Sequence, residues 1–257
     1  MSSIAQYPYP PFIFSLIISV PTVIIYSIEI IILIKYRRGF NSPFFHLFIA
    51  RFICNFLNYF GSFIFAKFGR VGAFLGFFES LHPQILAISF FFNFYSFHTD
   101  NLSTFFILLN RLTLLLFPNN QANIWKYFFP ISILAIFLIP LPFTYPILGY
   151  NFYVRKQNDN WTFTLDYKKE EGKSYIPSPY FCAISAGTFS VVCGLLNILI
   201  IFLYHKSQKQ FKMLPSAVTN RLKTENHKME SRLTIYAFVT FLGQLFLAIF
   251  NVSTRVI

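Results

Sequence analysis

The stretch Ile107-Leu108-Leu109-Asn110-Arg111-Leu112-Thr113 places an amide and a guanidinium inside an otherwise apolar run. A second apolar run, residues 114–117, follows this pair and ends at Pro118. At the edge of a lipid bilayer, the guanidinium reaches the headgroups or a partner while the flanking leucines stay in hydrocarbon. The stretch therefore predicts the cytoplasmic end of a membrane-spanning helix.

The composition of the chain predicts a multi-spanning membrane protein. Of its 257 residues, 55% are hydrophobic and 21% aromatic, but only 12% are charged. A soluble domain carries about a quarter charged residues, so the charge deficit decides the class. The net charge of +12 comes from basic residues in short blocks between apolar runs. This pattern fits membrane topology better than a nucleic-acid surface, and no nucleic-acid partner is expected.

Six apolar runs are long enough to cross a bilayer, which takes about 20 residues. We predict an all-α fold, a multi-pass transmembrane helical bundle that forms one domain over residues 1–257. Prolines in the fourth run predict a helix that is broken in its outer half. The hydrophilic segment 151–180 is expected to be an exposed loop. The predicted spans are about 12–34, 44–66, 84–109, 127–150, 181–204 and 233–252, with no seventh.

The distribution of Lys and Arg predicts the orientation. One set of alternate connections holds three, two and seven of them, whereas the other set holds none, two and five. Twelve against seven places the amino terminus outside the cell. The sequence Asn160-Trp161-Thr162 is a glycosylation acceptor that would then lie on the outer side, which agrees with the count. No cleavable signal peptide is expected, so the first span would act as a signal anchor.

The third span carries a polar stripe at helical spacing. Because lipid penalises such a face, the stripe is expected to point into the bundle. Its outer part, Asn93, Ser96 and Asp100, is a candidate ligand-binding region, and Arg111 would control the inner side. The alternative is that these groups only bond to neighbouring helices. The stripe consists of Asn93, Ser96, Asp100, Ser103, Thr104 and Arg111.

Helix geometry predicts two polar pairs by depth. Asp100 and Asn55 each lie about 15 Å from the inner edge and are expected to approach each other, with Asp100 protonated or holding a cation. Glu29 and Arg51 each lie about 10 Å inside the same edge and are expected to form an ion pair. A structural link between helices is the favoured purpose of the first pair, with an ion or switch site at Asp100 as the alternative. Neutralisation of two buried charges is the favoured purpose of the second pair.

No motif points to catalysis, a metal or a cofactor. The five histidines are scattered without HxxH, HxxxH or HExxH spacing. GxSxG and GxxxxGK[ST] are also missing from the sequence. We expect no enzyme activity, no metal site and no cofactor. The basic segment 205–232 is compatible with an acidic cytoplasmic partner, although positive-inside topology alone produces the same composition.

The order of several short motifs resembles a known receptor family. The run Leu108-Leu109-Asn110-Arg111-Leu112-Thr113, then Phe117-Pro118 and Trp125-Lys126, resembles the third-helix end and second inner loop of nematode serpentine chemoreceptors of the gamma superfamily, class gamma or the related class V. Three further stretches are similar to that family: Asn41-Ser42-Pro43-Phe44-Phe45, residues 140–148 with Thr144-Tyr145, and Phe238-Val239-Thr240-Phe241-Leu242-Gly243-Gln244-Leu245.

This resemblance implies a rhodopsin-like, seven-helix receptor in the plasma membrane of chemosensory neurons. Such a receptor binds a small molecule from outside and signals to a heterotrimeric G protein. Asn110-Arg111 would take the place of the Asp/Glu-Arg-Tyr segment of rhodopsin-like receptors, with a partner for Arg111 near Glu225 or Glu230. The departures are the missing acid before Arg111, the missing cysteine at the outer end of the third span, and the missing seventh span. A transporter or channel-like protein and a truncated, nonfunctional receptor product are the alternatives.

Overall fold

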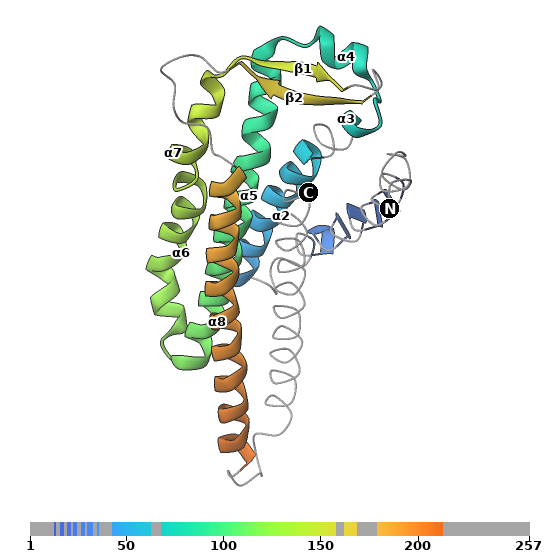
Figure 1. Cartoon of the computed structure of the whole chain (residues 1–257). Coiled ribbons are helices and arrows are strands. Elements are labelled where there is room, and N and C mark those ends of the chain that lie inside the picture. The colour runs from blue at the N-terminus through green and yellow to red at the C-terminus, as the bar shows by residue number, and fades with distance from the viewer. Residues whose placement is uncertain are drawn as a thin grey trace. The chain divides into compact units, whose positions relative to one another are not determined.

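The computed structural model describes residues 43–62, 68–157, 162–168 and 179–212, together with the helical residues 13, 16, 17, 20, 21, 23, 24, 27, 28, 30, 31, 32 and 35. This part of the chain is mostly helical (Figure 1). It divides into two compact units. Unit 1 comprises Met1–Asp100 and Ile133–Pro177, and unit 2 comprises Asn101–Ser132 and Ser178–Ile257. Two helices, α5 (Pro83–Leu116) and α6 (Gln121–Leu138), contribute to both units.

Unit 1 pairs helix α2 (Pro43–Ser62) with the N-terminal half of α5. The chain between them, expected to be a plain connection, contains two short helices, α3 (Phe68–Arg70) and α4 (Leu75–Ser80). Each helix end leaves backbone groups without intrahelical partners. In the turn between α3 and α4, backbone hydrogen bonds satisfy some of these groups. These short helices bring the chain to the start of α5.

A β-hairpin packs on this end of unit 1 (Figure 1). Strand β1 (Phe152–Lys156) pairs antiparallel with β2 (Phe163–Tyr167), with Phe152 opposite Tyr167. Residues on a strand alternate between faces, so the phenylalanines share one face and Arg155 and Asp166 the other. Phe152 and Phe163 are buried in a cluster with α4 and α5. The expected exposed loop is therefore wrong for this part of 151–180, because the alternating apolar residues form a sheet with a buried face.

The closest backbone approach in this region requires a glycine. A Cβ on Gly69 of α3 would lie 2.5 Å from the backbone oxygen of Phe163. Real side chains do not tolerate such a distance to a backbone atom, so Gly69 lets β2 pack directly against α3.

The predicted break in the fourth apolar run is confirmed. Helix α6 accommodates Pro130 but ends at Leu138, and α7 (Leu141–Thr144) and the 3₁₀ helix η2 (Tyr145–Gly149) follow. Proline cannot donate a backbone hydrogen bond, so Pro140 cannot continue the α6 ladder. The chain resumes as short helical turns, and Ile147 is buried there among the residues beneath the hairpin.

Unit 2 contains the C-terminal half of α5, most of α6, and α8 (Pro179–Lys212). Leu108 and Leu112 of α5 pack with Cys193 and Ile200 of α8 in one apolar cluster. Helix α5 continues to Leu116, so the Asn110–Arg111 pair lies inside the helix and not at its end. Trp125 lies within α6, which begins at Gln121, although it was expected in a loop.

Two helical segments of the described part are long and apolar enough to cross a bilayer, Gln121–Gly149 and Gly187–Lys206. The sixth predicted span, 233–252, lies outside the described residues. The predicted number of six spans therefore stays a prediction.

Candidate functional site

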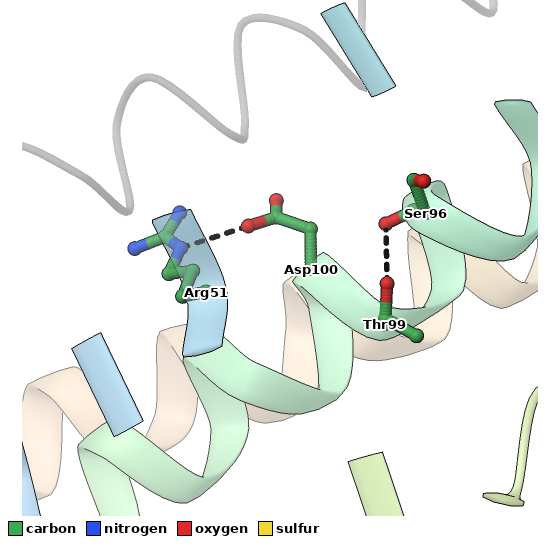
Figure 2. A network of polar contacts seen from close by, with 4 residues as sticks. All are labelled: Arg51, Ser96, Thr99 and Asp100. Carbon is green, nitrogen blue, oxygen red and sulfur yellow. Dashed lines mark hydrogen bonds and ion pairs between the residues drawn. The ribbon is translucent and has the colours of Figure 1, made fainter. Parts of the chain in front are cut away.

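A buried ion pair joins α2 to α5 within unit 1. Arg51 Nε donates a hydrogen bond to Asp100 Oδ1 at 2.8 Å, and the two side chains are 8% and 18% exposed (Figure 2). A charge in so dry a place is stable only when it is paired, and removal of one partner takes away part of that compensation. The pair is therefore the strongest polar constraint seen between these two helices.

This ion pair was not among the predicted pairs. The predicted approach of Asp100 to Asn55 and the predicted pair of Arg51 with Glu29 stay predictions. Arg51 precedes Asn55 by about one helical turn, or about 6 Å along the axis. The long arginine side chain spans such an offset, and a guanidinium is a better partner for a carboxylate than a carboxamide is. Glu29 lies outside the described residues.

A second level of contact between α2 and α5 lies at Asn93. A Cβ on Gly61 of α2 would lie 3.4 Å from the Cα and Cβ of Asn93, so the two helices approach closely here. Asn93 itself is only half-buried. Its backbone therefore serves helix packing, whereas a role of its side chain in ligand binding stays a prediction.

Ser96 lies one helical turn before Asp100, on the same face of α5. Its side chain is fully buried, and its Oγ has no hydrogen-bond partner among the residues that the structure describes. The hydroxyl of Thr99 donates to the Ser96 carbonyl at 2.9 Å and thereby bonds to its own helix (Figure 2). A buried hydroxyl without a partner loses its hydration for nothing in return, so Ser96 is the residue here that most needs a further polar group.

The predicted polar stripe of α5 is largely buried. Four of its members, Ser96, Ser103, Thr104 and Arg111, are buried, and the other two, Asn93 and Asp100, are half-buried. This burial agrees with the expectation that the stripe faces the protein and not lipid.

Tyr95 forms a contact that the sequence analysis did not identify. Its hydroxyl donates to the backbone oxygen of Phe137 at 2.9 Å, within unit 1. Phe137 lies in the last turn of α6, where carbonyl groups lose their intrahelical donors. Tyr95 thus satisfies a carbonyl near the proline break, and the nearby prolines were the signal that a donor would be needed.

A second polar arrangement surrounds Asn110 and Arg111 in unit 2. Both residues are buried, with 3% and 5% of their surfaces exposed. Thr113 Oγ1 donates to the Asn110 carbonyl at 2.9 Å and accepts a hydrogen bond from Trp125 Nε1 at 2.7 Å. Of the two expectations for Arg111, the headgroups or a partner, its burial inside the helix favours a partner.

Other predicted features lie outside the described residues. These are the glycosylation candidate Asn160 and the proposed partners of Arg111, Glu225 and Glu230. Within the described ranges, His, Cys, Asp and Glu form no group of three or more that would hold a metal ion.

Comparison with known proteins identifies the family of the chain. A model of the Srg family of chemoreceptors matches residues 12–257. The chain belongs to the Srg chemoreceptor family. It is similar to serpentine receptor class gamma-31 of Caenorhabditis elegans, with 31% identity over 140 residues. The matched stretch covers 51% of this chain and 45% of that relative, so it spans under half of the relative's length.

Family membership confirms the resemblance to the gamma superfamily. It makes this Srg protein an integral membrane protein of helical, multi-pass type. It also points to a receptor and not to an enzyme. The polar groups of α5 are therefore interpreted below as parts of a receptor.

Proposed function

We propose that this Srg protein is a G-protein-coupled receptor of the plasma membrane that binds a small molecule from outside the cell. In this proposal the amino terminus is extracellular, and residues 1–257 form one receptor domain with six spans of a seven-helix architecture. The observation that carries the proposal is the buried polar stripe on α5, which has Arg51–Asp100 near its middle and Asn110–Arg111 near its end.

The ligand region is proposed around Asn93, Ser96 and Asp100. Ser96 supports it best, because a ligand with a hydrogen-bonding group would satisfy its buried hydroxyl. Asp100 offers a carboxylate that Arg51 already partly neutralises. Competition of a ligand for either charge would weaken the link between α2 and α5.

The signal is proposed to travel along α5. A helix is stiff, so a change at Asp100 is carried to Asn110 and Arg111, about 15 Å away along the same axis. Ligand binding favours an arrangement in which these buried residues become available to a heterotrimeric G protein. Arg111 is the residue proposed to control this inner side.

Expression of the full chain with a promiscuous G-protein α subunit and a calcium reporter tests the proposal. We expect at least one compound from a panel of small organic molecules to evoke a concentration-dependent response. Ser96→Ala should shift its potency by about 3- to 10-fold, which corresponds to one lost hydrogen bond. Ser80→Ala, at an exposed serine, is the matched control.

Arg111→Ala provides the second arm of this experiment. It should abolish the response while surface expression and compound binding persist, because it removes the group proposed to control the inner side. A full response from Arg111→Ala, or equal effects of Ser96→Ala and Ser80→Ala, would contradict the assigned roles.

A further inference from the structure

The hydrogen bonds around Trp125 form a relay between two helices of unit 2. The indole N–H of Trp125 in α6 donates to Thr113 Oγ1 at 2.7 Å, and that hydroxyl donates to the Asn110 carbonyl at 2.9 Å. A hydroxyl accepts and donates at once, so Thr113 satisfies the indole and passes the constraint to the turn that contains Asn110. We name Trp125, Thr113 and Asn110 the relay.

The burial of Trp125 is unusual for its position in the sequence. Tryptophans near the ends of membrane helices commonly lie at the headgroup level, where one end of the ring is wet. Trp125 is instead fully buried, whereas its neighbours Lys126 and Tyr127 are exposed. Its ring packs edge-on against Phe128 at 5.4 Å, and Phe128 contacts Phe106 of α5 at 6.1 Å. Trp125 therefore fixes α6 to α5 by both packing and a directed hydrogen bond.

The relay holds α5 in a conformation that has an unfavourable feature. Asn110 is 97% buried, since 3% of its surface is exposed, and its Nδ2 has no hydrogen-bond partner within the described ranges. A buried donor without an acceptor opposes the state that buries it. The contacts of Trp125 favour the buried state of Asn110, which we call the closed turn. The balance between these two effects decides how often the turn opens and exposes Asn110.

We propose that Trp125 is a positioning residue that holds the α5 turn at Asn110 against α6, and that breaking the relay loosens this turn and exposes the unpartnered Asn110 Nδ2 to a carbonyl acceptor on a cytoplasmic partner. The proposal rests on the inner-side role of Asn110 and Arg111 proposed above. It adds the device that controls their exposure, and its first test requires neither ligand nor G protein.

A native cysteine reports on the opposite face of this turn, where α5 packs against α8. Cys193 of α8 is buried in the cluster with Leu108 and Leu112, the residues of α5 that flank Asn110. Any opening of α5 from α8 exposes Cys193 to a thiol reagent. Cys54 of α2 is equally buried but belongs to unit 1, so it serves as an internal control in the same molecule.

The experiment measures the rates at which N-ethylmaleimide modifies Cys193 and Cys54 in the full chain, in lipid nanodiscs, on a Cys182→Ser background. Trp125→Phe keeps an aromatic ring but removes the donor, and Thr113→Val keeps the shape but removes the hydroxyl. We expect each to speed modification of Cys193 by about 3- to 10-fold, the effect of one hydrogen bond on an equilibrium. Cys54 should react at its original rate.

Two further variants separate a positioning role from simple packing. Thr113→Ser retains the hydroxyl and should restore the original Cys193 rate, and the double variant Trp125→Phe/Thr113→Val should react no faster than either single variant because both break one relay. Trp161→Phe, at the chain's other tryptophan, should change nothing.

Three results would overturn the proposal: an unchanged Cys193 rate in Trp125→Phe, equal acceleration at Cys193 and Cys54, or additive effects in the double variant. A chain that shows the expected rates but never activates a G protein would contradict the proposed function and leave the relay established.

Discussion

The two halves of α5 are held in different ways. The N-terminal half lies beneath the hairpin, where aromatic rings from several elements pack around Leu86 and Ala87. The C-terminal half contacts a smaller, mainly aliphatic cluster in unit 2, around Leu108 and Leu112. Ring packing removes much apolar surface and adds favourable edge and stacking geometry, whereas the C-terminal half contacts fewer rings and adds the hydrogen bonds of the relay.

This difference indicates which half of α5 can adopt a second conformation. A region fixed by many packed rings has few alternative arrangements, because interiors are close-packed. A turn fixed by one relay has an open alternative that differs by the energy of one or two hydrogen bonds. A receptor needs such an imbalance, since a small ligand shifts an equilibrium only where the two states are close in free energy. The predictions below therefore compare the two halves.

The largest effect is expected beneath the hairpin. Phe163→Ala removes a fully buried ring and should lower the free energy of unfolding by about 3–5 kcal/mol. Thermal unfolding, followed by the reaction of buried thiols with a fluorogenic maleimide, measures the change. Thr164→Ala, the exposed neighbour on β2, should stay within about 0.5 kcal/mol. Similar values for the two variants would show that the hairpin does not fasten this end of α5.

The ion pair between α2 and α5 should rank next. Arg51→Ala or Asp100→Ala alone removes this ion pair and should lower stability by about 2–4 kcal/mol, somewhat less than for a fully buried pair because Asp100 retains some exposure. The swapped pair Arg51→Asp/Asp100→Arg should recover part of this loss. If the swapped variant loses as much stability as the two single variants together, the ion pair is not the source of the stability that these residues provide.

Removal of the hydroxyl at Tyr95 should have a smaller effect. Tyr95→Phe leaves the Phe137 carbonyl without this donor and should lower stability by about 0.5–1.5 kcal/mol. Tyr153→Phe, on the outward face of the hairpin, is the matched control. The same unfolding assay measures the change. Equal losses of stability for the two variants would contradict a stabilising role of the Tyr95–Phe137 hydrogen bond.

The smallest effect is expected at the exposed pair Lys156–Glu79, which links β1 to α4 at 2.8 Å. Both side chains are more than 40% exposed, so Lys156→Ala should change stability by less than about 1 kcal/mol. Salt at about 1 M should erase even this difference. A large effect that persists in salt would mean that the hairpin relies on charge and not on its rings.

The sequence predicted well what depends on composition and on proline. The helices α2 and α5 and the break after Leu138 follow from apolar runs and from a residue type that cannot donate a hydrogen bond. The buried polar face of α5 follows from spacing. Membership in the Srg family was also recognisable, because short motifs occurred in the right order.

The ion pair between α2 and α5, the β-hairpin and the relay do not follow from the sequence patterns alone. The Arg51–Asp100 pair does not follow from depths counted from a helix end at about residue 109, because α5 continues to Leu116. Backbone depth also ignores the length of the Arg51 side chain. The hairpin was missed because a long polar segment was judged as a whole, although Phe152-Tyr153-Val154 and Phe163-Thr164-Leu165 each alternate in the period of a strand. The relay joins residues of two helices, so no spacing of residues along one helix predicts it.

The rate of Cys193 modification in Arg51→Ala tests the central claim most directly, because the variant lies in unit 1 and the reporter in unit 2. If α5 carries a change from Asp100 to the Asn110 turn, Arg51→Ala should speed the reaction of Cys193, and the swap Arg51→Asp/Asp100→Arg should return it toward the original rate. A Cys193 rate that stays constant in Arg51→Ala, while the same chain still opens in Trp125→Phe, would contradict transmission along the helix.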